Sequence, residues 1–220
     1  MVGVLEVNKL IVESQNDKYF VQRIIKKLNL KNIEISEPIC SIDEYICLDG
    51  ISKLKNKLQD MKLDSIDKLG IIIDADDIGI EKRIDEINTI LNELKLDIKL
   101  ENINEFKKDS KYDLEIACYI LNINGKGDLD LILKNIAINS TVYADCLSSW
   151  EDCLKIHKMK ISEKEMIKFW VNNYIKFDIC DKKERKQSFK NCNLEKALQK
   201  DVWNFEDKHL EGLKTFLKLF

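Results

Sequence analysis

The 220-residue sequence contains little proline and little glycine: one proline, Pro38, and seven glycines. Flexible linkers are rich in glycine, serine or proline, so no segment reads as a linker between separate parts. The sequence also lacks an apolar run near the roughly 18 residues that a membrane helix needs. Its start, MVGVLEVNKLIVE, carries Glu6 and Asn8 inside the apolar pattern, unlike a secretory signal peptide. These absences predict a cytoplasmic protein without a membrane segment.

Histidine and paired cysteines are scarce too. The chain has two histidines, His157 and His209, and seven cysteines, an odd number without a CxxC pair. A zinc site would need ligands gathered from distant parts of the fold. The sequence therefore favours buried, reduced thiols that pack as small hydrophobic side chains, and neither histidine receives a chemical role. The cysteines are Cys40, Cys47, Cys118, Cys146, Cys153, Cys180 and Cys192.

No excess of positive charge is present either. The 36 lysines and arginines are balanced by 39 aspartates and glutamates, which leaves a formal net charge of −3. This balance argues against a protein that binds nucleic acid over its whole surface. It is compatible with an acidic site that takes a phosphate substrate through a metal ion, because the ion reverses the local charge.

The apolar residues alternate between strand and helix spacing through the first two-thirds of the chain. The order β-α-β-α-β-α-β-β predicts an α/β fold with a mostly parallel central sheet flanked by helices. Asn16 or Asp17 would cap the first helix. The expected strands are 4–13, 33–40, 69–74, 95–103 and 115–123, and the expected helices are 17–29, 50–62 and 80–94.

From about residue 146 the pattern becomes helical and aromatic. We expect an α/β domain over residues 1–145 and a helical C-terminal extension over residues 146–220 packed on it. The apolar residues of the terminal segment share one helix face, which predicts packing onto the sheet domain or a partner. They are Leu210, Leu213, Phe216, Leu217 and Phe220.

Two segments of this extension are locally basic, 155–168 and 181–190. Lysines and arginines clustered in this way could contact a phosphate backbone. Solvated helix faces have the same composition, and that interpretation is favoured.

The stretch GIIIDADDIG ends an apolar run in three carboxylates. Alternate residues of a strand share a face, so Asp74 and Asp76 would point the same way and could hold a cation such as Mg²⁺ or Mn²⁺. Asp77 would either join the metal site or cap the next helix. Gly79 would allow a tight turn. The alternative is equally well supported: these acids could serve only as turn residues and helix caps, positions where aspartate is also common.

The stretch LIVESQND also ends an apolar run in an acid, Glu13, and a second acid, Asp17, follows four residues later. If the two apolar runs form adjacent parallel strands, Glu13 would meet Asp74 and Asp76 at one edge of the sheet. Carboxylates crowded in this way repel one another, which requires either a divalent cation or a raised pKa. The sequence favours the cation.

These two motifs together resemble the Toprim domain, which topoisomerases, bacterial primases and overcoming-lysogenization-defect nucleases share. Glu13 matches the glutamate that ends its first strand, while Asp74, Asp76 and Gly79 match its DxDxxG motif. Ser14 is a departure, because many Toprim proteins carry glycine there. The resemblance implies a Toprim-like α/β fold.

A second resemblance covers ILNINGKGDLDLIL (120–133) and VWNFEDKHLEGLKTFLKLF (202–220). Both are similar to segments of a family of short, stand-alone Toprim-related bacterial proteins of unknown function. Asn122 stands where that family tends to have proline, and Asp130 stands where it tends to have glutamate.

The Toprim resemblance implies phosphoryl transfer or phosphodiester cleavage. Asp74 and Asp76 would hold Mg²⁺, and Glu13 would act as a general acid or base or as a ligand shared with a second ion. Asp17 and Asp130 would belong to the outer part of the metal site.

A nuclease is the favoured member of this class. The chain has no zinc-ribbon spacing of a primase, no room for the tyrosine-bearing domain of a topoisomerase, and no GxxxxGK[ST] motif of an ATPase. The resemblance to overcoming-lysogenization-defect nucleases implies a separate ABC-type ATPase partner and a role in defence against foreign nucleic acid. The alternative function is a non-catalytic subunit that senses metal, nucleotide or nucleic acid within a larger complex.

Overall fold

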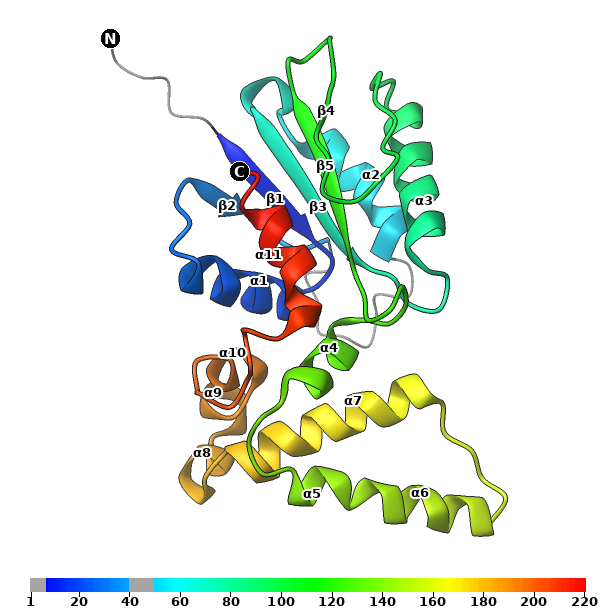
Figure 1. Ribbon diagram of the computed structural model, residues 1–220, viewed down its shortest axis with the longest axis vertical. Helices are drawn as coiled ribbons and strands as arrows, with labels where there is room; N and C mark the ends of the chain where they lie inside the picture. The colour runs from blue at the N-terminus through cyan, green and yellow to red at the C-terminus, as the bar shows by residue number, and fades with distance from the viewer. Residues whose placement is uncertain (1–6, 40–49) are drawn as a thin grey trace.

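The computed structural model describes residues 7–39 and 50–220, and within these ranges the chain forms a five-stranded sheet (Figure 1). The strands are β1 (Asn8–Val12), β2 (Ile33–Ile35), β3 (Lys68–Asp74), β4 (Lys107–Lys108) and β5 (Glu115–Leu121). Their order is β2-β1-β3-β5-β4, with β4 antiparallel and the other pairs parallel. The expected α/β fold with a mostly parallel sheet is confirmed.

Helices cover both faces of the sheet, because its strands are apolar on both sides. Ile71 of β3 shares a buried cluster with Leu54 and Ile87 on one face. Ile72 points the opposite way and shares the other cluster with Phe20. The first face is covered by α2 (Gly50–Asp60) and α3 (Ile80–Glu93), and the second by α1 (Gln15–Lys27) and α11 (Glu211–Leu217).

The chain from about residue 146 onward is helical, as expected from its sequence, and two further helices that the sequence did not predict lie between β5 and this region. An aromatic cluster lies in this region, where the Tyr174 ring is 5.2 Å from the Trp170 ring and 5.2 Å from the Trp203 ring, centroid to centroid. Figure 1 shows the arm made by α5, α6 and α7 at the end of the molecule away from β4. The elements are α4 (Leu129–Ile136), α5 (Val142–Asp145), α6 (Leu147–Ile156), α7 (Glu163–Asn173), the π-helical η2 (Tyr174–Ile179), α8 (Lys182–Lys186), α9 (Ser188–Asn191), α10 (Leu194–Ala197) and the 3₁₀ turn η3 (Lys208–Leu210); a further 3₁₀ turn, η1 (Leu63–Ser65), precedes β3.

The end of the chain returns to the sheet. The Phe216 ring lies 5.8 Å from the Tyr119 ring of β5, and Lys68 Nζ of β3 donates to the Leu219 carbonyl at 2.9 Å. A Cβ at Gly70 would collide with the Phe220 ring, so this glycine makes room for the terminal segment. The expected packing of this segment onto the sheet domain is confirmed.

The expected strand at 95–103 is wrong. Its side chains alternate between buried and exposed, but the segment forms no ladder with the sheet. Its backbone bonds to side chains instead: Asp97 N–H donates to Asp109 Oδ2 at 2.8 Å, and Leu100 N–H donates to Asn88 Oδ1 at 2.8 Å. The alternation of apolar and polar residues therefore reflects the burial of alternate side chains. The backbone hydrogen bonds that a neighbouring strand would make are made by side chains instead.

Most of the remaining boundaries follow the sequence within a few residues, but the second strand ends at Ile35, well before the expected end at 40, and β4 was not expected. Positions 4–6 of the first expected strand and position 40 of the second lie outside the described residues. The division into parts at residues 145 and 146 stays a prediction. None of the described helices is long and apolar enough to cross a lipid bilayer.

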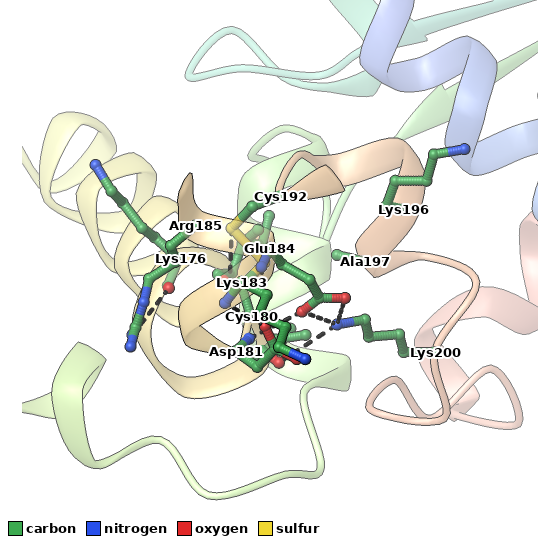
Figure 2. A network of polar contacts seen from close by, with 12 residues as sticks. Lys176, Cys180, Asp181, Lys183, Glu184, Arg185, Cys192, Lys196, Ala197 and Lys200 are labelled. Carbon is green, nitrogen blue, oxygen red and sulfur yellow. Dashed lines mark hydrogen bonds and ion pairs between the residues drawn. A yellow bond between two sulfur atoms is a disulfide. The ribbon is translucent and has the colours of Figure 1, made fainter. Parts of the chain in front are cut away.

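The cysteines depart from the expectation of buried, reduced thiols. Cys180 and Cys192 form a disulfide next to α8 (Figure 2). Cys146 and Cys153 are free but exposed, whereas Cys118 of β5 is free and buried. Sequence spacing carried no signal for the disulfide, because the tertiary packing of η2 and α9 brings its two sulfur atoms together. The other two cysteines, Cys40 and Cys47, lie outside the described residues.

Candidate acidic site at the carboxyl edge of the sheet

The order in which strands are added to the sheet reverses between β1 and β3. The chain passes from β1 to β2 on one side of this point, and from β3 to β5 on the other side. Open α/β sheets bind ligands outside the carboxyl ends of the strands at such a point. Val12 is in register with Ile72, and just beyond them Glu13 Oε2 accepts a hydrogen bond from Asp74 N–H at 3.2 Å. The two strands are adjacent and parallel as expected, and both acids lie at this edge.

Asp74 and Glu13 are crowded carboxyl groups. Asp74 Oδ1 is buried and has no hydrogen-bond partner within the described part of the chain. Burial raises the pKa of Asp74 well above its usual range, and the charges of Asp17, Glu13 and Asp128 raise it further. Burial also raises the pKa of Glu13, and the hydrogen bond from Asp74 N–H opposes that rise. Ionising these groups together is therefore costly without a cation.

Asp17 reaches the same edge from the start of α1. Ser14 is the N-cap, not Asn16 or Asp17 as the sequence suggested. Ser14 N–H and Oγ donate to Asp17 Oδ2 at 2.8 and 2.7 Å, and Asp17 N–H donates to Ser14 Oγ at 3.2 Å. This capping box aims Asp17 inward. Ser14 has an extended backbone, φ −125°, so this position does not require glycine.

Burial dominates the electrostatics of Asp17. Asp17 is only 2% exposed, and its Oδ1 has no hydrogen-bond partner in the described residues. Burial raises the pKa of Asp17 to about 7, helped by the charges of Glu13 and Asp130 and opposed by the Ser14 hydrogen bonds. Asp17 is thus a second buried carboxyl with an unpaired oxygen.

Asp76 lies beyond the strand, in a left-handed backbone conformation with φ +48°. Its N–H donates to the Gly127 carbonyl at 2.8 Å, and Gly127 N–H donates back to the Asp76 carbonyl at 2.9 Å. The direction of its side chain is therefore decided by this bridge to the β5–α4 turn, and not by the strand alternation expected from the sequence. Non-glycine residues in this conformation are uncommon and often mark functional turns.

Asp77 follows in the exposed part of the turn. It does not cap α3, because the N-cap is Gly79, whose φ is +88° and which has no side chain to form a cap hydrogen bond. The glycine at this position adopts the conformation expected of it. The capping alternative for Asp77 is therefore wrong, and its role in a metal site stays a prediction.

The turn between β5 and α4 supplies the remaining acids. Asn124 and Gly125 form a tight hairpin turn with φ +53° and +92°, and Asn122 Oδ1 accepts from Gly125 N–H at 2.9 Å. Asp128 then caps α4, accepting from the Leu131 N–H. Asp130 is half-buried in the first turn of α4, and its charge raises the pKa of Asp17.

Asp128 is a site residue that the sequence analysis missed. Its charge raises the pKa of Asp74, which places it among the edge carboxylates. The available signal was an aspartate directly after a glycine-containing turn that follows an apolar strand.

Two cations of the site were also missed, Arg83 and Lys164. Arg83 Nη2 and Lys164 Nζ each form an ion pair with Asp76, through Oδ2 and Oδ1 respectively. Lys164 Nζ also lies 3.6 Å from Asp128 Oδ2. Arg83 stands seven residues after Asp76, in the first turn of α3, so its closeness along the chain was a signal for it. Nothing in the sequence connects Lys164 of α7 with the edge. Only the packing of α7 on α4 brings it there.

The donor set suits a hard divalent cation, because all the acids offer carboxylate oxygens. The unpaired oxygens of Asp17 and Asp74 are buried at this edge. Within the described residues, however, no three His, Cys, Asp or Glu side chains are already arranged around one metal position. Binding therefore requires side-chain rotation, and Asp76 would exchange its ion pairs with Arg83 and Lys164 for the metal.

Comparisons with other proteins give the following. Residues 7–220 match the model of a family described as "Protein of unknown function (DUF3226)". A hypothetical protein from Pyrococcus horikoshii OT3 is similar at 15% identity and a TM-score of 0.47, over 97% of this chain and 95% of that one. The C-terminal region of the OLD protein of Xanthomonas campestris pv. campestris is similar at 11% identity and a TM-score of 0.36, over 98% and 96%. No curated protein matches.

Proposed function

The chain belongs to the DUF3226 family of proteins of unknown function, and we propose that it is a Mg²⁺- or Mn²⁺-dependent enzyme that cleaves phosphodiester bonds in nucleic acid. The observation that carries the proposal is the contact of Glu13 with Asp74 at the ends of two adjacent parallel strands. Both carboxyl groups have raised pKa values, largely through burial. A divalent cation would relieve the repulsion that this arrangement creates.

The relation to Toprim proteins belongs to this proposal. The resemblance rests on an apolar strand that ends in Glu13 and a later strand that ends in the DxDxxG motif of Asp74, Asp76 and Gly79. The adjacency of β1 and β3 supports it, because the two motifs lie at one edge of the sheet at its switch point.

The chemistry follows from the residues that the edge brings together. When bound, Mg²⁺ would polarise a phosphate and stabilise charge on the attacking and leaving oxygens. Asp74 and Asp76 would hold it. Burial raises the pKa of Glu13, which suits this group to hold or release a proton as general acid or base. Lys164 would be free to pair with a phosphate oxygen once Asp76 turns away from it.

The other acids would support this centre. Asp17 and Asp130 approach it from the first turns of α1 and α4, and we assign both to the outer part of the metal site, together with Asp128. Asp77 is exposed in the turn beside Asp76, where it would contact the ion through water.

A cleavage assay on the purified protein tests the proposal. Plasmid, linear duplex and single-stranded DNA, and RNA, would be incubated with Mg²⁺, Mn²⁺ or EDTA. We expect cleavage that requires metal and is lost in Glu13→Gln and in Asp74→Asn. Asp85→Asn, an exposed acid on α3, is the matched control and should retain activity.

Cleavage that survives both edge variants would overturn the assignment of these residues. Cleavage in EDTA equal to that in Mg²⁺ would overturn the metal dependence.

One observation favours the second candidate, a non-catalytic subunit that senses metal, nucleotide or nucleic acid. Arg83 and Lys164 already neutralise Asp76, so part of the edge is balanced without a metal. Such a subunit would show a higher melting temperature with Mg²⁺ or Mn²⁺, abolished by Asp74→Asn, and no cleavage product. A separate ABC-type ATPase partner and a role in defence against foreign nucleic acid belong to the proposal through family resemblance alone.

A further inference from the structure

The helical arm, taken from here on to include η2, α8 and α9, which follow α7, differs in charge from the rest of the protein. Residues 155–190 contain eleven lysines and arginines and five acids, within a chain whose formal net charge is −3. An excess of this kind is usually dispersed over solvated helix faces. Whether it forms a binding surface depends on how the acids of the segment are used and on what lies beside the cations.

The acids around α8 bond to the protein itself. Asp178 accepts from Tyr143 N–H and Ala144 N–H at 3.0 Å each. Asp181 caps α8 by accepting from the N–H groups of its first turn. Glu184 accepts from Lys200 Nζ at 2.7 and 2.8 Å (Figure 2). These three carboxylates are therefore used in hydrogen bonds to backbone N–H groups and in an ion pair with Lys200.

The cations of the same stretch are left without acids. Within the described part of the chain, no carboxylate lies at ion-pair distance from any of them. Figure 2 shows Lys176 and Arg185 extending away from the Glu184–Lys200 pair. The group consists of Lys176, Lys182, Lys183, Arg185 and Lys186.

Exposed aromatic rings lie beside these cations. The Phe177 ring is 39% exposed and 6.0 Å from the Tyr143 ring, which is 60% exposed. Lys176 Nζ and the Arg185 guanidinium lie 5.7 and 5.6 Å from the centroid of the Phe177 ring. Arg185 Nη1 also donates to the Lys176 carbonyl at 3.5 Å, which holds the guanidinium near the ring.

A second exposed aromatic pair continues the surface along the arm. The Trp150 and Phe169 rings are 5.9 Å apart and are 40% and 39% exposed. Phe169 and Phe177 are eight residues apart on the continuous helix of α7 and η2. Eight residues make about two helical turns, so the two rings point to similar sides at a spacing of about 12 Å.

We propose that this aromatic and cationic surface of the arm binds single-stranded nucleic acid. Exposed rings offer faces on which unpaired bases stack, and unpaired cations neutralise phosphates. Duplex bases are already stacked on one another, so a single strand is the form that these rings can use. The surface consists of Tyr143, Trp150, Phe169, Lys176, Phe177 and Arg185.

Helix α7 connects this surface with the acidic edge. Lys164 in the first turn of α7 pairs with Asp76, and Phe169 lies five residues further along the same helix. The inference rests on the proposed function, because that function makes nucleic acid the substrate. The inference narrows this substrate to single strands. Binding can be measured without cleavage, so the two can be tested separately.

Fluorescence anisotropy in EDTA tests the proposal on the full chain. The probes are labelled 20-nucleotide oligo(dT), oligo(U) and a duplex of equal length. We expect the wild type to bind single strands at least about tenfold more tightly than duplex. Tyr143→Ser combined with Phe177→Ser should weaken single-strand binding about tenfold. Ile138→Ser combined with Ile156→Ser removes two exposed apolar side chains without rings and should change nothing.

A charge variant keeps the test independent of the aromatic replacements. Lys176→Gln combined with Arg185→Gln should reduce the slope of log affinity against log salt by about 1.4, since each phosphate contact on a single strand contributes about 0.7. Lys82→Gln combined with Lys99→Gln, two exposed lysines elsewhere, should leave the slope unchanged. Circular dichroism and melting temperature verify that each variant is folded.

Absence of single-strand binding by the wild type would overturn the inference, as would equal binding of duplex. Folded ring and charge variants that both bind like the wild type would overturn it as well. If the wild type binds single strands but cleaves no nucleic acid in Mg²⁺ or Mn²⁺, the result would count against the proposed function and not against this inference.

Discussion

The acidic edge and the region of α8 both bring carboxyl groups close together, but the protein surrounds them differently. At the edge, burial raises the pKa values of Glu13, Asp17 and Asp74. Around α8, hydrogen bonds from the N–H groups of Glu184 and Lys183 lower the pKa of Asp181, and the hydrogen bond from Lys200 Nζ lowers that of Glu184.

The difference shows which acids serve the fold. The α8 acids accept hydrogen bonds from a helix start or a lysine, and their charge stabilises the folded state. One oxygen of each of Asp17 and Asp74, the buried Oδ1, has no partner in the described residues, so the charge of these groups opposes folding. Unsatisfied buried groups concentrate at functional sites, where a ligand completes them. Proximity of acids alone would not have separated the two regions.

The largest expected effect separates the two regions by activity. Glu13→Gln should lower the initial rate of metal-dependent cleavage by at least about a hundredfold, because a general acid or base contributes about that much. Glu184→Gln, which changes an acid of the α8 region, should lower it less than about twofold. Comparable losses in both variants would show that the edge holds no special role.

The second effect concerns pH. The pKa of Asp17 is raised to about 7 in the folded protein, above the value of about 3.9 in an unfolded chain. The proton therefore stabilises the folded state fully below about pH 4, and this contribution is lost as the pH rises through about 7. In EDTA, the free energy of unfolding of the wild type relative to Asp17→Asn should fall by about 2 kcal/mol between pH 5 and pH 8. Urea unfolding measures both proteins.

Asp181→Asn is the control for this pH dependence. The pKa of Asp181 is lowered, so its stabilising contribution is present above the unfolded pKa and is lost only as the pH falls through more acidic values. The wild type and Asp181→Asn should run parallel from pH 5 to pH 8. A divergence as large as that of Asp17→Asn would contradict the contrast between the regions.

The third effect compares two capping boxes of the same design. Ser14 bonds the buried Asp17, and Ser162 bonds the exposed Glu165 at the start of α7. Ser162→Ala should cost about 1 kcal/mol of stability, the usual value for a lost cap. Ser14→Ala should cost about 2 kcal/mol, because it also removes the hydroxyl that donates to a buried carboxyl, Asp17. Chemical unfolding at pH 7 without metal tests this, and equal costs would show that Asp17 needs no support from the cap.

The smallest effect belongs to the Glu184–Lys200 ion pair. Its groups are partly exposed, so Glu184→Gln should cost only about 0.5 kcal/mol at low salt and less at high salt. Melting temperatures at two salt concentrations measure it. A large cost that persists in high salt would mean that α8 depends on this pair far more than its exposure indicates.

The sequence contained the site only in part. Apolar runs ending in acids predicted that Glu13 and Asp74 would share an edge, since parallel strands align their carboxyl ends. It did not reveal the left-handed turn at Asp76 or the approach of Lys164, because both depend on elements that are distant along the chain. Alternation misled at 95–103, where side chains took over the hydrogen bonding of a segment outside the sheet.

What the sequence by itself determined is the order of strands and helices, the apolar faces that build two layers of helices on a parallel sheet, and the acids at the strand ends. These are local periodicities, and local chemistry dictates them. The tertiary structure decided which acids are buried without partners, which are neutralised by Arg83 and Lys164, and which rings and cations stay exposed on the arm. Burial and charge pairing depend on which distant segments meet in space, and no local pattern records that.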